Sequence, residues 1–375
     1  MPLRIHHSID DIAAPAWDAL AGPQPFLSHA YLSALERTGC VGRGTGWRSA
    51  IAALWRDGEL IAALPLYLKT HSWGEYVFDW AWADAYAQHG LTYYPKWLGA
   101  VPFTPVPGPR LLARDTTTRA ELLSQVLDHV RDSGASSLHI LFAQEADVDV
   151  GRAHGMLVRE GVQFHWHNAG YGNFDDFLAA LSHDKRKKIR QERRKVSDAG
   201  VSLRALRGHE ITAQHWAFFA RCYATTYALH GATPYLNQAF FEALGAQLPA
   251  SCLLLLAERG GTPLAASLLL CDGDAVYGRY WGAVEHVPCL HFEACYYRPI
   301  EEAIAMGAAR FEGGAQGEHK LARGLDPVRT YSLHWLADER FQDAVAHYLR
   351  RETGGIELYV NELETRRPFK AAPSV

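Results

Sequence analysis

The chain has 375 residues, of which 48% are hydrophobic and 21% are charged, so it can bury a large core and is long enough for two domains. Its net charge of −4 excludes a surface that is basic throughout, although one local basic patch is compatible with it. Charges and prolines interrupt residues 1–20, and no apolar run approaches the roughly 20 residues that span a bilayer. The six cysteines form no CxxC pair, which predicts reduced thiols and a cytoplasmic protein.

The first half of the chain predicts an α/β unit. Apolar residues recur at helical spacing over residues 26–38, and residues 49–69 form the pattern of two strands joined by an Asp57-Gly58 turn. A further helix is expected over residues 119–132, followed by a strand over residues 137–143.

Between these elements, bulky aromatic residues alternate with smaller ones over residues 76–86. This period of two predicts a strand with one aromatic face, on which Phe78 and Trp80 belong to the core. We expect the polar end of that face to form the rim of a groove for an extended acceptor, with residues 101–110 as one wall. The rim residues are Asp84, Tyr86 and His89.

Residues 182–197 are the most basic stretch of the chain. Between His183 and Lys195 there are eight Lys or Arg residues and two acids, a local charge of +6 that leaves −10 for the remainder. The stretch predicts a helix that is capped by Ser182 and packs its apolar residues inward. Its outer face is expected to carry Arg186, Arg190, Arg193 and Arg194. Such a face suits the phosphates of a tRNA, a nucleotide-linked precursor or a membrane surface, and a solvated helix without a ligand is the alternative.

The second half repeats the element order of the first. Helices are expected over residues 214–229 and 238–244, turn-linked strands over residues 252–283, a helix over residues 292–306 and a strand over residues 309–313. We therefore predict an α/β fold with mixed sheets in two tandem domains, residues 1–165 and 166–375. The element order in each is that of the acetyltransferase-type acyl-CoA (GNAT-like) fold, which alone says nothing about function.

A polar loop follows the last predicted strand. Glu312 stands at the carboxyl end of that strand and precedes Gly313-Gly314, where a substrate can approach the backbone closely. We expect Glu312 to be the base that deprotonates an amine, or the anchor of that amine, and an ion pair with a nearby arginine is the alternative. His319 is expected to move protons, because an imidazole titrates near neutrality. Tyr280, on the preceding strand, is the third catalytic candidate.

Further polar side chains are expected to bind the substrate. Lys320 and Arg323 follow His319 and suit a phosphate or a carboxylate, whereas Arg279 and Trp281 flank Tyr280. The loop over residues 285–293 lacks the glycines that would bind the pyrophosphate of acetyl-CoA, which argues against a conventional acetyl-CoA site. Cysteine, histidine and glutamate alternate at its end, but they begin a helix, where alternate residues diverge, so no metal site is predicted.

Nearly the whole chain resembles the bacterial Fem-like predicted N-acyltransferases, a peptidoglycan-related group with two such domains. The segments that carry the resemblance are residues 26–42, 64–96, 182–196, 277–297 and 311–324. The resemblance implies acyl or aminoacyl transfer from acyl-CoA or aminoacyl-tRNA, with no tightly bound cofactor and with a cell-wall precursor or another small molecule as acceptor. Fem-type enzymes carry a comparable acidic-Gly-Gly strand end and a lysine-bearing loop, which favours the region of Glu312 and His319 as the site.

These observations together predict a cytoplasmic N-acyltransferase without a metal. Its site would be a cleft lined by Glu312, His319, Tyr280, Trp281 and Tyr86, with the basic helix at its mouth. The alternative is a non-catalytic protein that binds RNA, another phosphate compound or an anionic membrane surface through the basic helix. No transmembrane segment is expected, so any membrane contact would be peripheral.

Overall fold

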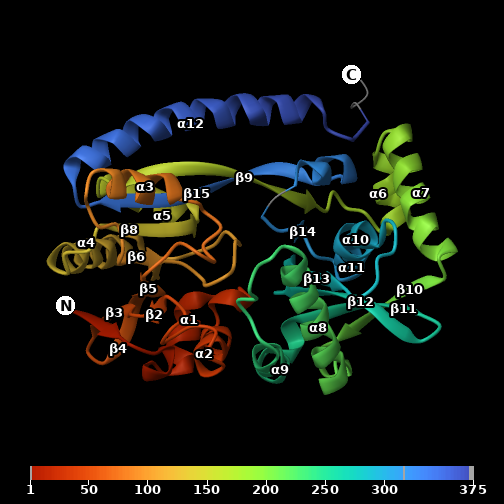
Figure 1. The fold of residues 1–375 in the computed structure, drawn as a ribbon, viewed down its shortest axis with the longest axis horizontal. Helices are drawn as coiled ribbons and strands as arrows, with labels where there is room; N and C mark the ends of the chain where they lie inside the picture. The colour runs from red at the N-terminus through yellow and green to blue at the C-terminus, as the bar shows by residue number, and fades with distance from the viewer. Residues whose placement is uncertain (1, 316, 371–375) are drawn as a thin grey trace. The chain divides into compact units, whose positions relative to one another are not determined.

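A computed structural model describes residues 2–315 and 317–370, which form a mixed α/β structure (Figure 1). The chain divides into two compact units, unit 1 with residues 1–162 and 329–358 and unit 2 with residues 163–328 and 359–375. The sequence analysis assigned residues 329–358 to the second domain. They group with unit 1 because β15 (Asp326–Leu336) pairs antiparallel with β8 (Ser137–Ala143) over Tyr331–Leu336. No described helix is long and apolar enough to cross a membrane.

Unit 1 contains two sets of paired strands. The first set has the order β1 (Leu3–His6), β3 (Ile51–Arg56), β4 (Glu59–Leu64) and β7 (Leu112–Ala113). The second set has the order β2 (Trp47–Ser49), β5 (Leu66–Lys69), β6 (Lys96–Gly99), β8 and β15. In that second set β6 and β8 are parallel, with Gly99 opposite Ile140. The predicted turn joins β3 to β4, and Asp57 and Gly58 have the left-handed φ values of 51° and 84° that a tight hairpin turn requires.

The core of unit 1 lies around α4 (Thr116–Asp132), which contacts β3, β4 and β8. Asp115 caps this helix by accepting a hydrogen bond from the Thr118 amide at 2.8 Å. The apolar side chains of α4 recur every three or four residues and are buried: Leu122, Leu123, Val126, Leu127 and Val130. The other helices of unit 1 are α1 (Ala14–Ala21), α2 (His29–Arg37), α3 (Trp80–Gln88), α5 (Glu145–Ala153) and the first part of α12 (Glu339–Thr365).

The predicted aromatic strand over residues 76–86 is wrong, because residues 80–88 form the helix α3. Trp82 and Tyr86 are four residues apart and therefore share one helix face, which is buried, whereas the intervening alanines favour a helix over a strand. Phe78 was expected in the core but is 51% exposed.

The prediction that residues 101–110 form one wall of a groove is also wrong. Gly108 pairs with Ala143 in a parallel bridge, and Arg110 is fully buried beneath it. This segment therefore belongs to the interior of unit 1.

Unit 2 has one set of strands in the order β10 (Val201–Arg207), β11 (Cys252–Arg259), β12 (Thr262–Cys271), β13 (Ala275–Ala283), β14 (Arg310–Glu312) and β9 (Leu157–His167). The predicted turn-linked strands over residues 252–283 are confirmed, because β11 pairs antiparallel with β12 and β12 pairs antiparallel with β13. β13 and β14 are parallel, and their last matched pair is Tyr277 with Glu312.

The helices of unit 2 begin with α6 (Phe174–Ala180) and the basic helix α7 (His183–Asp198), followed by α8 (Ala213–Leu229) and α9 (Gln238–Gln247). The helix predicted over residues 292–306 is present in three parts: α10 (Leu290–Phe292), a π-helical turn over Glu293–Tyr297 and α11 (Arg298–Ala305). α8 contacts β12 and β13, whereas α11 contacts β13 and β14. A short 3₁₀ segment, Glu318–Arg323, connects β14 to β15.

Candidate active site at the end of β14

Glu312 is the last residue of β14, at the point where the parallel pairing of β13 and β14 ends. Its side chain is buried, and its Oε1 accepts a hydrogen bond from Arg310 Nε at 3.1 Å. Its Oε2 has no hydrogen-bond partner among the described residues. Burial raises the pKa of Glu312 to about 7, against the lowering effect of Arg310. A carboxyl group with such a pKa accepts and releases a proton near neutrality, as a general base must.

The strand β9 presents His165 directly opposite Glu312. His165 Nε2 lies 3.9 Å from the unpaired Glu312 Oε2 and 3.1 Å from Gln163 Oε1. Burial lowers the pKa of His165 to about 3, so the imidazole is neutral. His165 therefore provides a polar neighbour for Glu312 without neutralising its charge.

Arg310 holds one side of the Glu312 carboxylate in place. Its guanidinium also pairs with Asp274 and donates to the Tyr277 hydroxyl at 3.2 Å, and that hydroxyl donates to Asp272 at 2.6 Å. The ion pair with Arg310 thus involves one carboxylate oxygen, whereas the other oxygen is buried without a hydrogen-bond partner among the described residues.

The backbone beside Glu312 is open because glycines flank it. Gly314 has a φ of 85°, in the left-handed region that favours glycine. A Cβ at Gly278 on β13 would lie 3.3 Å from the carbonyl oxygen of Glu312, closer than most real contacts. The two strands therefore approach closely at the strand end, and glycine is needed there because a Cβ at Gly313 would lie 2.8 Å from the Leu325 side chain.

Lys320 lies next to this strand end. The Lys320 side chain is buried and passes Gly313, where an added Cβ would lie 3.5 Å from Lys320 Cδ. Its ammonium donates to the Gly314 carbonyl at 2.9 Å and makes no other hydrogen bond among the described residues. Burial lowers the pKa of Lys320 to about 8, which leaves the group mostly charged at neutral pH. A buried, under-coordinated ammonium is well suited to bind an anionic or carbonyl oxygen.

His319 and Arg323 occupy different positions. His319 is exposed, its Nε2 is 3.0 Å from the Tyr296 hydroxyl, and burial together with Arg323 and Lys320 lowers its pKa. Arg323 is buried, pairs with Glu192 of α7 at 3.1 Å and lies 3.6 Å from the centre of the Phe292 ring. Arg323 therefore anchors the 3₁₀ segment to α7, and the Glu192 pair occupies the guanidinium that was expected to bind substrate.

The candidates on β13 are Arg279, Tyr280 and Trp281, which follow Tyr277, the residue matched with Glu312. Arg279 donates to the Tyr280 hydroxyl at 3.2 Å, at a bulge in the pairing of β12 with β13. Tyr280 is buried and packs edge-on against Tyr223 with ring centres 5.3 Å apart. Trp281 is half-buried and its ring centre lies 5.7 Å from that of His291.

The basic helix α7 buries its apolar stripe as expected, through Ile189 and Val196. Ser182 is the N-cap residue, although its side chain makes no capping hydrogen bond. Arg193 pairs with Glu293 of the π-helical turn at 2.9 Å and with Glu301 of α11 at 3.1 Å. It occupies the buried side of the helix because it lies four residues after Ile189. The buried Glu293 was missed as its partner, although a lone acid inside an apolar helix start is a signal for such a pair.

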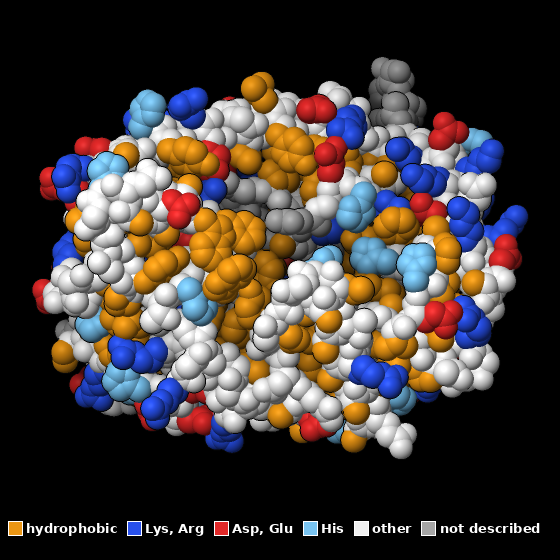
Figure 2. Space-filling view, in the orientation of Figure 1, with side chains coloured by type: hydrophobic (Ala, Val, Ile, Leu, Met, Phe, Trp, Pro, Cys, Tyr) orange, Lys and Arg blue, Asp and Glu red, His pale blue; other side chains and the backbone are white. Residues whose placement is uncertain are grey.

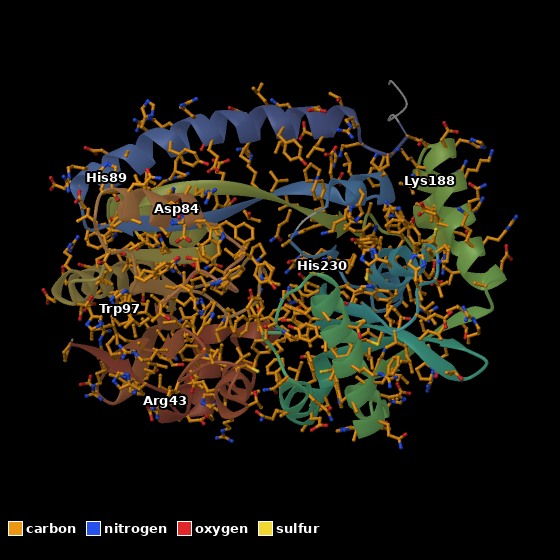
Figure 3. The ribbon with its side chains drawn as sticks, in the orientation of Figure 1. Arg43, Asp84, His89, Trp97, Lys188 and His230 are labelled. Carbon is orange, nitrogen blue, oxygen red and sulfur yellow. The ribbon has the colours of Figure 1, made fainter. Side chains whose placement is uncertain are left out.

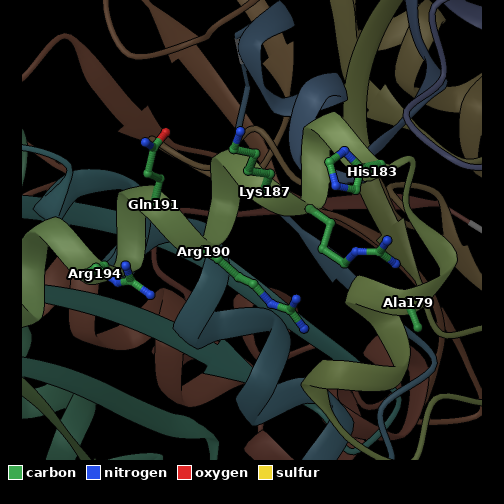
Figure 4. Close-up of a pocket in the computed structure, with 7 residues that line it drawn as sticks. Ala179, His183, Lys187, Arg190, Gln191 and Arg194 are labelled. Atoms are coloured by element: carbon green, nitrogen blue, oxygen red, sulfur yellow. The ribbon is translucent and has the colours of Figure 1, made fainter.

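The remaining arginines of α7 line a groove of about 610 Å³ (Figure 4). Arg190 is 3.5 Å from Asp175, whereas Arg186, Lys187 and Arg194 have no ion-pair partner among the described residues. Lys and Arg side chains are visible at the right-hand edge of Figure 2, where α7 lies. The groove therefore presents several positive charges to one ligand.

Of the rim residues predicted in the first half, Asp84 and Tyr86 belong to α3 and His89 is its C-cap residue. Asp84 and His89 are exposed (Figure 3), and Tyr86 is buried with its ring centre 4.0 Å from that of Phe341. Their role in binding an acceptor stays a prediction.

Unit 1 also contains a buried ionic cluster that the sequence analysis missed. Lys96 donates to Glu75 at 2.8 Å and pairs with Asp79, and Lys69 lies 3.8 Å from Glu75. Burial lowers the pKa of Lys69 to about 7 and raises that of Glu75 to about 7. Only the facing positions of the two lysines on β5 and β6 could have suggested the cluster, because the two acids come from the following loop.

Comparisons with known proteins identify the family of this chain. The profile of the FemAB-like family, described as peptidoglycan biosynthesis/recognition, matches residues 8–371. The chain belongs to the FemAB-like family. No curated protein sequence matches it.

Solved structures share the FemAB-like fold at low sequence identity. The crystal structure of FemX is 12% identical, with 92% of this chain and 100% of that chain covered and a TM-score of 0.56. The C-terminal domain of a putative lysylphosphatidylglycerol synthetase from Agrobacterium fabrum is 8% identical, with 88% and 94% covered and a TM-score of 0.54. L-PGS from Bacillus licheniformis is 9% identical, with 85% and 96% covered and a TM-score of 0.53. These similarities establish the fold.

Proposed function

We propose that this protein transfers an acyl or aminoacyl group to an amine, at the end of β14 in unit 2. The observation that carries the proposal is the buried carboxyl group of Glu312, which keeps one oxygen unpaired where the parallel strands β13 and β14 separate. The FemAB-like family and the fold shared with FemX and a putative lysylphosphatidylglycerol synthetase support transfer chemistry of this class.

Glu312 would act as the general base of the transfer. The amine nitrogen of the acceptor attacks the carbonyl carbon of the donor, and Glu312 Oε2 takes the proton that this nitrogen loses. The bond from the carbonyl carbon to the sulfur of a CoA thioester, or to the ribose oxygen of an aminoacyl-tRNA, then breaks, and the leaving atom receives a proton. The Lys320 ammonium, 2.9 Å from the Gly314 carbonyl, is the candidate donor to the negative oxygen that forms during attack.

We assign substrate recognition to the groove of α7 and to side chains of β13. The groove of α7, with Arg186, Arg190 and Arg194, would bind the phosphates of the donor. Arg279, Tyr280 and Trp281 on β13 would contact the acyl group or the acceptor, for which an amine of a cell-wall precursor is the candidate. His319 is assigned to proton transfer with solvent, because it is the exposed imidazole of the loop after β14.

A second candidate function is binding without turnover. It rests on the three cations of the α7 groove that lack ion-pair partners and does not involve Glu312. In that case the protein would hold RNA or another phosphate compound through α7 alone, and its affinity would fall steeply as salt is raised.

The two candidates are separated by Glu312→Gln. Transfer of a labelled acyl group from a panel of CoA thioesters and aminoacyl-tRNAs to amine acceptors should fall by roughly 100-fold or more, as expected for loss of a general base. Donor affinity, measured by titration, should stay unchanged. Glu318→Gln is the matched control, because Glu318 is in the same loop, is exposed and pairs with Arg366. Activity of Glu312→Gln equal to that of the wild type would refute the assignment of the base.

A further inference from the structure

A second hollow, in unit 1, combines an apolar lining with several polar side chains. It has a volume of about 720 Å³ and lies between the loop over residues 42–46, the edge strand β2 and the end of β5. The polar side chains that line it are His7, Glu36, Arg43, Arg48, Ser49, Thr70 and His71. We infer that this hollow binds a small molecule through a phosphate group. The inference is independent of the proposed transfer reaction, because none of these residues belongs to the site at β14.

The two arginines are the first reason. Arg43 and Arg48 are exposed, and neither forms an ion pair with a described residue (Figure 3 labels Arg43). Many other arginines of this chain are paired with acids, as Arg159 is with Glu352 at 2.8 Å. Two unpaired guanidinium groups in one hollow present planar donor forks that match a phosphate.

One acid, Glu36, offsets only one of the two guanidinium charges, and it forms no ion pair with either arginine among the described residues. Both oxygens of Glu36 accept hydrogen bonds, from Ser8 Oγ at 2.6 Å, from Ser49 Oγ at 2.7 Å and from the Ile9 amide at 3.1 Å. Glu36 therefore ties the amino-terminal segment to β2. The net charge that the hollow offers to a ligand remains positive.

The loop backbone adds neutral donors. Gly42, Gly44 and Gly46 have φ values of 131°, 84° and 74°, and a Cβ at Gly42 or Gly44 would meet nothing within 4 Å. The amides of Arg43, Gly44 and Gly46 make no hydrogen bond to another described residue. Successive amides without partners, as at Arg43 and Gly44, form the type of concavity that binds anions.

The base of the hollow is built and partly apolar. Trp47 is buried and Leu68 lies beside it, while the Lys69 ammonium is 3.8 Å from the centre of the Trp47 ring on the interior side. His71 donates from Nε2 to the Thr45 carbonyl at 3.1 Å, which fixes the end of the loop. A hollow of this size exceeds one phosphate, so it also has room for an organic group beside the half-buried Leu68.

Inorganic pyrophosphate is the probe that tests the inference, by isothermal titration calorimetry at low ionic strength. The α7 groove is first removed with Arg186→Ala, Arg190→Ala and Arg194→Ala, so that the remaining heat reports unit 1. Adding Arg43→Ala and Arg48→Ala to this variant should weaken binding by roughly 10-fold or more, because it removes the charged hydrogen-bond donors of the hollow.

The matched control adds Arg350→Ala and Arg351→Ala, which removes the same charge from exposed positions of α12 in unit 1. Affinity in this control should change little. Equal affinities in the two variants, or no binding before Arg43 and Arg48 are changed, would overturn the inference. Unchanged melting temperatures confirm that the exposed substitutions leave the fold intact.

Discussion

The two units contain the same arrangement of a parallel strand pair and use it differently. In unit 1 the pair β6 and β8 ends at Gly99 opposite Ile140, and the chain itself fills the space beyond. The Gly108 amide donates to the Phe142 carbonyl at 3.0 Å, and Arg110 Nε donates to the Leu141 carbonyl at 3.0 Å. In unit 2 the corresponding pair, β13 and β14, ends at the buried Glu312 and is followed by two glycines.

The difference teaches that a repeated fold need not repeat its chemistry. The last matched position of the second strand is the acid Glu312 in unit 2 and Ile140 in unit 1, and isoleucine has no acid–base function. At the end of the parallel pair in unit 1, residues 106–110 form hydrogen bonds with the backbone. In unit 2, a ligand could pair with the equivalent backbone groups. The hydrogen bonds of Arg110 stabilise unit 1, whereas the buried Glu312 Oε2 without a hydrogen-bond partner costs stability in unit 2, as expected if Glu312 is the proposed base.

The largest expected effect is on the ionic cluster of unit 1. Lys96→Met removes the cation between Glu75 and Asp79 and leaves two buried carboxylates without it, which should destabilise the protein by about 3–5 kcal/mol. Urea unfolding followed by circular dichroism measures this loss. Lys188→Met, at an exposed position of α7, is the control and should change stability by less than about 0.5 kcal/mol. A small effect at Lys96 would mean that the cluster does not stabilise unit 1.

The second effect concerns the pH dependence of unit 2. Because the folded-state pKa of Glu312 is raised to about 7, its contribution favours the folded state below its unfolded pKa near 4.5 and is lost as pH rises through about 7. Relative to the wild type, Glu312→Gln should therefore gain stability between these two pH values, by on the order of 3 kcal/mol. Thermal unfolding of both proteins at several pH values tests the sign. A difference that does not vary with pH would refute the raised pKa.

The smallest of the three effects tests whether unit 1 matters for the reaction. Arg110→Met leaves the carbonyls of Val106 and Leu141 without their donor and should cost about 2–3 kcal/mol of stability. Transfer activity at a temperature where the protein stays folded should be unchanged, because the proposed site lies in unit 2. Loss of activity in the folded variant would show that the closed end of the β6 and β8 pair takes part in function.

Local patterns in the sequence predicted several elements well, for physical reasons. The meander over residues 252–283 and the buried stripe of α7 follow from apolar periodicity, which depends only on neighbouring residues. The position of Glu312 at a strand end followed from the short apolar strand and the glycines after it. The helix α3 was wrongly predicted as a strand. Its alternating aromatic residues are also compatible with a helix, in which only Trp82 and Tyr86 are buried.

Features that depend on distant residues were not predictable. Nothing near Lys96 in the sequence indicates that Glu75 and Asp79 fold back over it. Arg193 and Glu293 are separated by 100 residues, so only the fold reveals their pair. Residues 329–358 return to unit 1 because β15 pairs with β8, a choice of strand partner that local periodicity does not determine.

The facing positions of Lys69 and Lys96 impose an order on folding. The two residues are matched across the antiparallel strands β5 and β6, and both are fully buried. Two ammonium groups directly opposite each other repel, so Glu75 and Asp79 from the following loop are needed to stabilise this strand pair. We therefore expect the loop over residues 70–79 to dock together with the strands rather than after them.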